Sequence, residues 1–204
     1  MRRFSSYFVV TSLCLLVAAA ASAAKQPSAP GGYTLVGNAP GTATLVPGPN
    51  GSGTAVQLMT YPSSGTLDWG AIGFAASGLK LRDVTDLSTD YEITFGGCWE
   101  GSPRFTVGLS NRGKTKEIWF YMGQPQGCAS EWTNTGNLAS PTSLVDDSSL
   151  PAGSHTATYS QVQAEYGNDN VAYIAIDLDG GGDGSQTALF DNTQVNGTLY
   201  TYES

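Results

Sequence analysis

Four aspartates lie close together near the C-terminal end of the chain, at a spacing that could serve a metal site, an acid catalyst or a turn. They fall in the stretch IDLDGGGDGSQTALFDNTQVNG, at Asp177, Asp179, Asp183 and Asp191. The calcium loop of EF-hand proteins does not fit, because Ala188 stands where that loop ends in a bidentate glutamate. Three consecutive glycines between two strand-like runs are typical of a sharp turn. The sequence therefore favours a turn over a calcium loop, and catalysis is disfavoured because no partner acid, base or nucleophile is nearby.

A second group of acids could form the carboxylate pair of a glycan-cleaving enzyme. Such enzymes need two carboxylates set apart across a cleft. Glu92 and Glu117 could share the non-core face of neighbouring or near-neighbouring strands. The alternative is that both are solvated, outward-pointing residues, with Arg104 as a partner. We therefore expect no catalytic residues, with Glu92 and Glu117 as the alternative pair.

Nucleophilic catalysis and zinc chemistry find little support. His155 is the single histidine, it lies in a polar stretch, and the chain has no G-x-S-x-G motif. The cysteines are expected to be oxidised, which leaves too few ligands for zinc. These features favour a binding protein over an enzyme.

Aromatic side chains give the clearest sign of a binding surface. The chain has four tryptophans, which are Trp69, Trp99, Trp119 and Trp132. Trp119 and Tyr121 flank the core-facing Phe120, so both rings project from the opposite face of their strand. Such rings stack on the apolar faces of sugars, while nearby polar groups can hydrogen-bond to hydroxyls. Unless a second layer buries the rings, the predicted ligand-binding residues are Trp119, Tyr121, Glu117 and Arg104.

Short alternating runs separated by Gly, Pro, Asn and Ser clusters are typical of an all-β protein. The expected strands are residues 33–36, 42–46, 54–61, 71–76, 91–95, 104–110, 116–123, 171–179, 186–195 and 198–203. Asn196-Gly197 predicts a two-residue hairpin, and residues 91–123 predict an antiparallel meander. Residues 160–166 could form one short helix. These patterns predict a two-sheet antiparallel β-sandwich, with a jelly roll favoured.

The first 24 residues have the pattern of a secretory signal peptide. Arg2 and Arg3 precede an apolar run over residues 7–20, and residues 21–23 offer a small-residue cleavage site. The run is short for a membrane span, so membrane insertion is not expected. Residues 25–32 predict a flexible leader and residues 33–204 a single β-sandwich domain. We expect a secreted, extracellular protein.

Cys98 and Cys128 remain after removal of this segment. An even pair in an exported protein predicts a disulfide rather than a metal or redox site. In the predicted meander both cysteines follow strand ends at the same edge, which makes the bridge geometrically reasonable.

The chain is acidic, with a formal net charge of −8. This charge repels the phosphates of nucleic acids and anionic lipids, so neither is an expected partner. Polysaccharides and cell-surface glycans are compatible with it.

The C-terminal stretch ALFDNTQVNGTLYTYE resembles the closing strands of carbohydrate-binding modules and galactose-binding-like jelly rolls. Together with GGCWEGSPRF and EWTNTGNL it is also similar to secreted bacterial proteins without assigned activity. The resemblance implies a structural calcium site at Asp191, shared with residues near the N-terminus. Residues 25–67 contain no Asp or Glu, so those ligands would be backbone or amide oxygens. No other cofactor is expected.

The leading hypothesis is a secreted, non-catalytic domain that binds carbohydrate or another extracellular surface. One alternative is a glycan-cleaving hydrolase or lyase on a jelly-roll scaffold. Another is a structural component of a cell surface or matrix.

Overall fold

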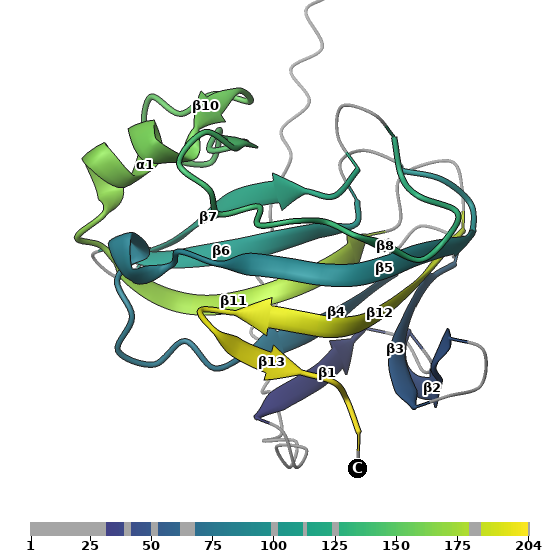
Figure 1. Ribbon diagram of the computed structural model, residues 1–204. Coiled ribbons are helices and arrows are strands. Elements are labelled where there is room, and N and C mark those ends of the chain that lie inside the picture. The colour runs from purple at the N-terminus through teal and green to yellow at the C-terminus, as the bar shows by residue number, and fades with distance from the viewer. Residues whose placement is uncertain are drawn as a thin grey trace, which may run out of the picture.

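Two antiparallel β-sheets pack face to face in the computed structural model (Figure 1). It describes residues 32–38, 42–49, 53–61, 68–98, 102–111, 114–123, 127–179 and 185–203. The predicted signal peptide, the leader up to residue 31, Trp99 and Asp183 lie outside the described residues. The architecture is the all-β jelly-roll sandwich that the sequence predicted.

The first sheet, sheet A, has the strand order β1-β4-β11-β6-β7. Its strands are β1 (Tyr33–Gly37), β4 (Trp69–Phe74), β11 (Asn170–Asp179), β6 (Arg104–Asn111) and β7 (Lys114–Tyr121). The second sheet, sheet B, has the order β2-β3-β12-β5-β8, with β13 also paired to β12. Its strands are β2 (Ala43–Pro47), β3 (Thr54–Thr60), β12 (Gln186–Val195), β5 (Leu87–Phe95), β8 (Thr133–Asn134) and β13 (Thr198–Tyr200).

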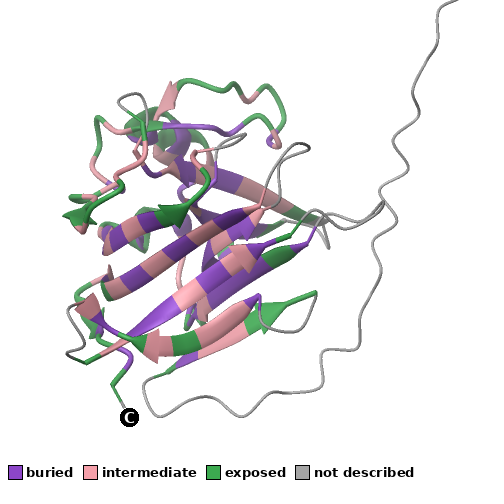
Figure 2. Cartoon of the chain, turned by 90° about the vertical axis from the view of Figure 1, so that its right-hand side faces the viewer, coloured by how far each residue is buried: buried purple, intermediate pink, exposed green. Residues whose placement is uncertain are grey.

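Side-chain alternation along the strands decides which residues meet between the sheets. Phe105, Val107 and Leu109 of β6 are fully buried, and so are Ile174, Ile176 and Leu178 of β11. Figure 2 shows the resulting bands of buried and less buried residues along the strands. Because successive side chains of a strand point to opposite faces, the residues between these core positions face away from sheet B.

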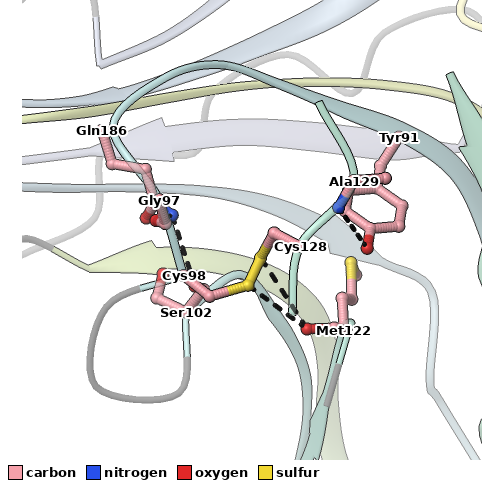
Figure 3. The surroundings of a disulfide bond; sticks show 8 residues. All are labelled: Tyr91, Gly97, Cys98, Ser102, Met122, Cys128, Ala129 and Gln186. Atoms are coloured by element: carbon pink, nitrogen blue, oxygen red, sulfur yellow. Dashed lines mark hydrogen bonds between the residues drawn. A yellow bond between two sulfur atoms is a disulfide. The ribbon is translucent and has the colours of Figure 1, made fainter. Parts of the chain in front are cut away.

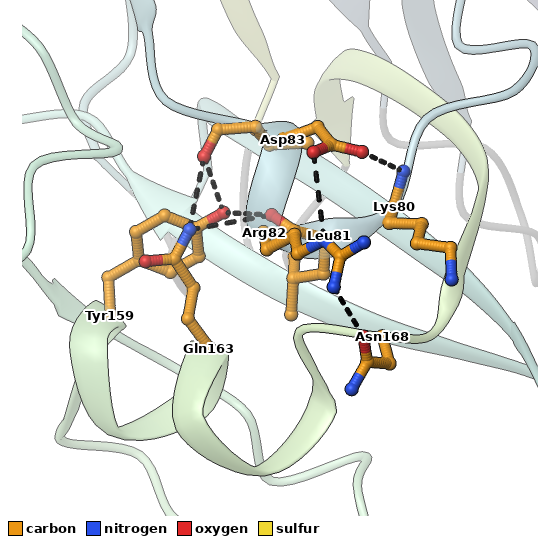
Figure 4. A network of polar contacts seen from close by, with 8 residues as sticks. Lys80, Leu81, Arg82, Asp83, Tyr159, Gln163 and Asn168 are labelled. Carbon is orange, nitrogen blue, oxygen red and sulfur yellow. Dashed lines mark hydrogen bonds and ion pairs between the residues drawn. The ribbon is translucent and has the colours of Figure 1, made fainter.

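A small unit next to β7 adds the short pair β9 (Leu144–Val145) and β10 (Ala157–Thr158), followed by α1 (Tyr159–Tyr166). The predicted helix over residues 160–166 is therefore confirmed. The Tyr159 ring packs edge-on against Phe120, with ring centroids 5.1 Å apart. Its hydroxyl donates to the carbonyls of Leu81 (3.1 Å) and Val84 (2.9 Å), around the 3₁₀ turn η2 (Leu81–Asp83) (Figure 4). No helix among the described residues has the length and apolar character needed to cross a membrane.

The predicted meander over residues 91–123 is wrong at its first strand. β6 pairs with β7, but β5 belongs to sheet B, where it pairs with β12 and β8. Residues 96–103 separate β5 from β6, and this connection exceeds the two to five residues of a usual hairpin loop. It instead carries the chain across the sandwich. Gln186 of β12 holds the crossing, because its amide donates to the carbonyls of Gly97 and Ser102.

The predicted disulfide between Cys98 and Cys128 is confirmed (Figure 3). Since β5 and β7 lie in different sheets, the bridge ties a loop that leaves sheet B to a loop that leaves sheet A. Beside it, the Ala129 N–H donates to the Tyr91 hydroxyl at 3.3 Å. The disulfide is thus a covalent connection between the two layers.

The hairpin at Asn196-Gly197 is confirmed as well. Val195 pairs with Thr198, and the two turn residues have φ values of 50° and 78°. Asparagine and glycine tolerate this left-handed backbone better than other residues. The Asn196 side chain also accepts the Thr85 N–H at 2.9 Å, which ties the hairpin to the start of β5.

Removal of the disulfide by the double substitution Cys98→Ser and Cys128→Ser should lower the free energy of unfolding by roughly 3–4 kcal/mol. The physical reason is that the cross-link closes a segment with a sequence separation of 30 residues in the unfolded chain. Urea unfolding of the oxidised protein and of the double variant measures the difference. Equal midpoints and equal slopes would contradict the assigned role.

Candidate ligand-binding groove on sheet A

The outer face of sheet A is hollowed into an open groove of about 900 Å³. Its lining comes from β1, β4, β11, β6 and β7, so the groove runs across the full width of the sheet. Small residues form its floor, at Ala71, Gly73 and Ala175. Gly73 pairs with Ala175, and Ala71 pairs with Asp177, so these short side chains are neighbours across β4 and β11. The groove exists because the larger side chains stand around this floor.

Trp69 and Asp179 stand at one end of the floor, where they are cross-strand partners. Trp69 is 39% exposed, which leaves much of its indole ring open to a ligand. Its backbone is held by Asn38, whose side-chain oxygen accepts the Trp69 N–H at 2.8 Å. This end therefore offers an aromatic surface next to a carboxylate.

Arg104 extends along the groove from β6. It forms an ion pair with Asp179, and its guanidinium carbon lies 5.7 Å from the centroid of the Trp119 ring. Only 14% of the Arg104 side chain is exposed. The ion pair and the cation–π contact offset the cost of burying this charge.

Asp177 pairs with Arg104 across the strands but makes no ion pair among the described residues. Burial raises the pKa of its carboxyl group to about 6, and the charges of Asp179 and Glu117 act in the same direction. Arg104 and the Thr106 hydroxyl lower this pKa in part. The negative charge of the Asp177 carboxylate is therefore only partly compensated by its neighbours in the groove.

Tyr173 and Glu117 are further polar residues of the groove lining, in addition to Asp177 and Arg104. The Tyr173 hydroxyl donates to Glu117 Oε1. The Tyr173 ring can lie over residue 108 because that residue is a glycine. A Cβ atom added to Gly108 would clash with the ring, at 2.2 Å from Tyr173 Cε1. Burial and the Glu117 carboxylate raise the pKa of Tyr173, so its hydroxyl stays a donor.

A wall formed by residues 144–155 lies beside β7, at the edge of sheet A. The backbones of Trp119 and Asp146 exchange two hydrogen bonds, of 2.9 and 3.0 Å. The Tyr121 hydroxyl donates to Asp146 Oδ2 at 2.7 Å, and His155 Nδ1 lies 2.8 Å from the same oxygen. The His155 side chain is 79% exposed, whereas that of Asp146 is 5% exposed. Tyr121 is thereby bound to the wall.

The structure brings the four predicted ligand-binding residues to this one face of sheet A. Arg104 and Glu117 line the groove. Trp119 is half-buried and lies under the Arg104 guanidinium, while Tyr121 is hydrogen-bonded to the wall. Their roles in binding stay predictions, and the geometry gives Trp119 and Tyr121 supporting positions.

Sequence reasoning missed Trp69, Tyr173, Asp177 and Asp179 as groove residues. Asp177 and Asp179 lie within β11, as the predicted strand over residues 171–179 requires, while the three glycines of the predicted turn lie outside the described residues. The missed signal is the alternation of these acids with the buried Ile176 and Leu178, which places them on one outer face.

The alternative catalytic pair of Glu92 and Glu117 is not assembled. Glu92 lies on β5 of sheet B, between the buried Tyr91 and Ile93, so it faces away from sheet A. Glu117 lies on the outer face of sheet A. Packed sheets are about 10 Å apart, so carboxylates on their two outer faces lie farther apart than a glycosidase pair allows.

Comparisons with known proteins concern the fold. No protein-family model and no curated protein matches the chain. The structure is similar to the family 11 carbohydrate-binding module of the cellulosomal cellulase Lic26A-Cel5E of Clostridium thermocellum, with a TM-score of 0.50 and 11% identity over 80% of this chain and 86% of that chain. An exo-beta-agarase matches with a TM-score of 0.38 and 12% identity, over 84% of this chain and 24% of that chain. A loop-swap mutant of Necallimastix patriciarum Xyn11A matches with a TM-score of 0.33 and 15% identity, over 83% and 99% of the two chains.

The calcium site predicted at Asp191 stays a prediction. The described residues contain no group of three His, Cys, Asp or Glu placed to hold a metal ion. Asp191 Oδ1 instead accepts the N–H of Asn192 at 2.7 Å, and burial is the main cause that raises the pKa of Asp191. If calcium binds there, a chelator should lower the melting temperature, and Asp191→Asn should abolish that shift. A melting temperature that the chelator leaves unchanged removes the site.

His155→Ala should lower stability at about pH 5.5 and have no effect at about pH 9. The hydrogen bond to Asp146 raises the pKa of His155 above its usual 6.5, so the stabilising contact is complete below that value and is lost as the pH rises through the raised pKa. The Asp146 carboxylate keeps a lowered pKa and stays ionised at about pH 5.5. Urea midpoints across this pH range measure the effect, which should be small because the ring is exposed. A loss of stability that is equal at both pH values would show a packing effect instead of a charge effect.

Proposed function

We propose that this chain is an exported, non-catalytic domain that binds carbohydrate in the groove on sheet A. The observation that carries the proposal is the groove itself. The partly exposed Trp69 lies at one end of a floor of small residues, and hydrogen-bonding side chains lie beside that floor. Ligand sites of this kind combine an apolar surface with a few placed polar groups.

The chemistry of the groove suits sugars. A pyranose ring has an apolar face of C–H groups that can stack on the indole of Trp69. Its hydroxyls can donate to the carboxylates of Asp177 and Glu117 and accept from Arg104. The floor at Ala71, Gly73 and Ala175 leaves room for a flat ring against the sheet.

Two further features support an extracellular carbohydrate ligand. The Cys98–Cys128 disulfide and the signal-peptide pattern of the first residues suit an oxidising compartment outside the cell. The likeness in fold to a carbohydrate-binding module supports the same proposal. With Glu92 on the opposite sheet, a hydrolase built on Glu92 and Glu117 has no support in the geometry.

Trp69→Ala should weaken binding to the polysaccharide ligand about tenfold, because loss of an aromatic stacking contact costs roughly 1–1.5 kcal/mol. Pull-down with a panel of insoluble polysaccharides identifies the ligand, and isotherms with both proteins give the affinities. Phe95→Ala is the matched control, since Phe95 is an exposed aromatic residue of sheet B with 62% exposure.

The same panel tests the competing functions. Release of reducing sugar that Glu117→Gln abolishes would replace the binding proposal by an enzyme. Retention of no polysaccharide at all would favour a structural role. Equal losses for Trp69→Ala and Phe95→Ala would remove the groove as the site.

A further inference from the structure

We propose that the groove on sheet A selects an amino-sugar polymer, whose primary ammonium groups pair with Asp177 and Glu117. This inference rests on the proposed function and narrows its ligand class.

Among the described residues, the groove carries more negative than positive charge. Their part of its lining contains one cation, Arg104, and three carboxylates, at Glu117, Asp177 and Asp179. Arg104 is already in an ion pair with Asp179. Glu117 receives a hydrogen bond from the neutral Tyr173, which supplies no charge. Asp177 and Glu117 therefore remain without a cation among the described ion pairs.

The hydroxyl beside Asp177 does not supply the missing charge either. Thr106 is 1% exposed and lies on the groove side of β6, opposite Ala175 of the floor. Its hydroxyl lowers the pKa of Asp177 in part but carries no charge, and it is too deeply buried to contact a ligand. A charge that compensates Asp177 therefore has to come from a ligand in the groove.

A primary ammonium group supplies the missing charge. It has one positive charge and three donors, and its hydrogen bonds to a carboxylate are stronger than those of a neutral donor. An acidic polysaccharide would instead place its carboxylates or sulfates against Asp177 and Glu117, which like-charge repulsion disfavours. A neutral glycan can hydrogen-bond here but leaves the excess charge uncompensated.

The shape of the groove favours an amino sugar over a lysine-rich peptide. On a sugar ring the amine is fixed close to the apolar ring face, which can lie on the floor and against Trp69. A lysine side chain has several rotatable bonds, and binding must immobilise them at a cost in conformational entropy. We therefore expect an amino sugar to bind in the groove more tightly than a lysine side chain of the same charge.

Binding should depend on pH through Asp177. The groups that face it are Arg104 from β6, Glu117 from β7, and Tyr173 and Asp179 from its own strand, while the groove residues of β4 carry no charge. The pKa of free Asp177 is about 6. An ammonium ligand lowers that pKa, so affinity rises as the pH increases towards about 6, and it falls again at higher pH because the amines of the sugar lose their protons.

Calorimetry with short soluble oligomers tests the inference. The probes are hexamers of glucosamine, N-acetylglucosamine, glucose and galacturonic acid, together with a lysine peptide of the same charge as the glucosamine hexamer. We expect the glucosamine hexamer to bind at least tenfold more tightly than the others at about pH 6, and more tightly at about pH 6 than at about pH 4.5. Asp177→Asn should weaken its binding about tenfold at about pH 6 and remove this rise.

Two further variants make the result specific. Glu117→Gln should also weaken binding, which keeps a test available if Asp177→Asn fails to fold. Glu92→Gln is the matched control, because it removes the same charge from the outer face of sheet B and should leave binding unchanged.

Each outcome decides between the proposals. Tight binding of a neutral hexamer that Asp177→Asn does not affect overturns the amino-sugar inference and keeps the carbohydrate function. Equal binding of the lysine peptide also overturns it, since charge alone would explain the result. Failure of every sugar to bind overturns both.

Discussion

The register of β6 in sheet A is the constraint on which the groove depends. The buried side chains of β6, which are Phe105, Val107 and Leu109, pack against sheet B. Because side chains alternate along a strand, Arg104, Thr106 and Gly108 must lie on the outer face of sheet A. A slip of one residue would exchange the two sets and bury the arginine in the core. The same logic holds for β11, where Ile176 and Leu178 fix the direction of Asp177 and Asp179. Stability and site geometry are thus set by one pattern of alternation.

The outer face of sheet A holds the charge of the largely buried Arg104 through two contacts. The guanidinium forms an ion pair with Asp179 and a cation–π contact with the Trp119 ring. Removal of one partner of a buried charge usually destabilises a protein strongly, because the remaining charge stays buried without compensation. Trp119 therefore matters to the groove through Arg104, even though its own ring does not line the cavity.

Much of the fold could be predicted from local patterns, because alternation and Asn-Gly turns act over a few residues. The hairpin at Asn196-Gly197 and the helix at Tyr159–Tyr166 are of this kind. The disulfide joins residues 30 positions apart, and it could be predicted because an even pair of cysteines in an exported protein is typical of a bridge. The assignment of β5 to sheet B could not be predicted, since it depends on long-range pairing with β12. That pairing separates Glu92 from Glu117 and removes the predicted acid pair. Trp69 was missed because β4 begins two residues before the predicted strand.

The wall beside β7 has a consequence for the behaviour of the protein in concentrated solution. β7 is the last strand of sheet A, and an unpaired last strand exposes backbone groups that can recruit a strand from another molecule. Here the backbone of Asp146 already pairs with Trp119, and the Ser149 hydroxyl bonds both the N–H and the carbonyl of Glu117. The wall thus shields this edge of the sheet from intermolecular strand addition and from the aggregation that follows from it.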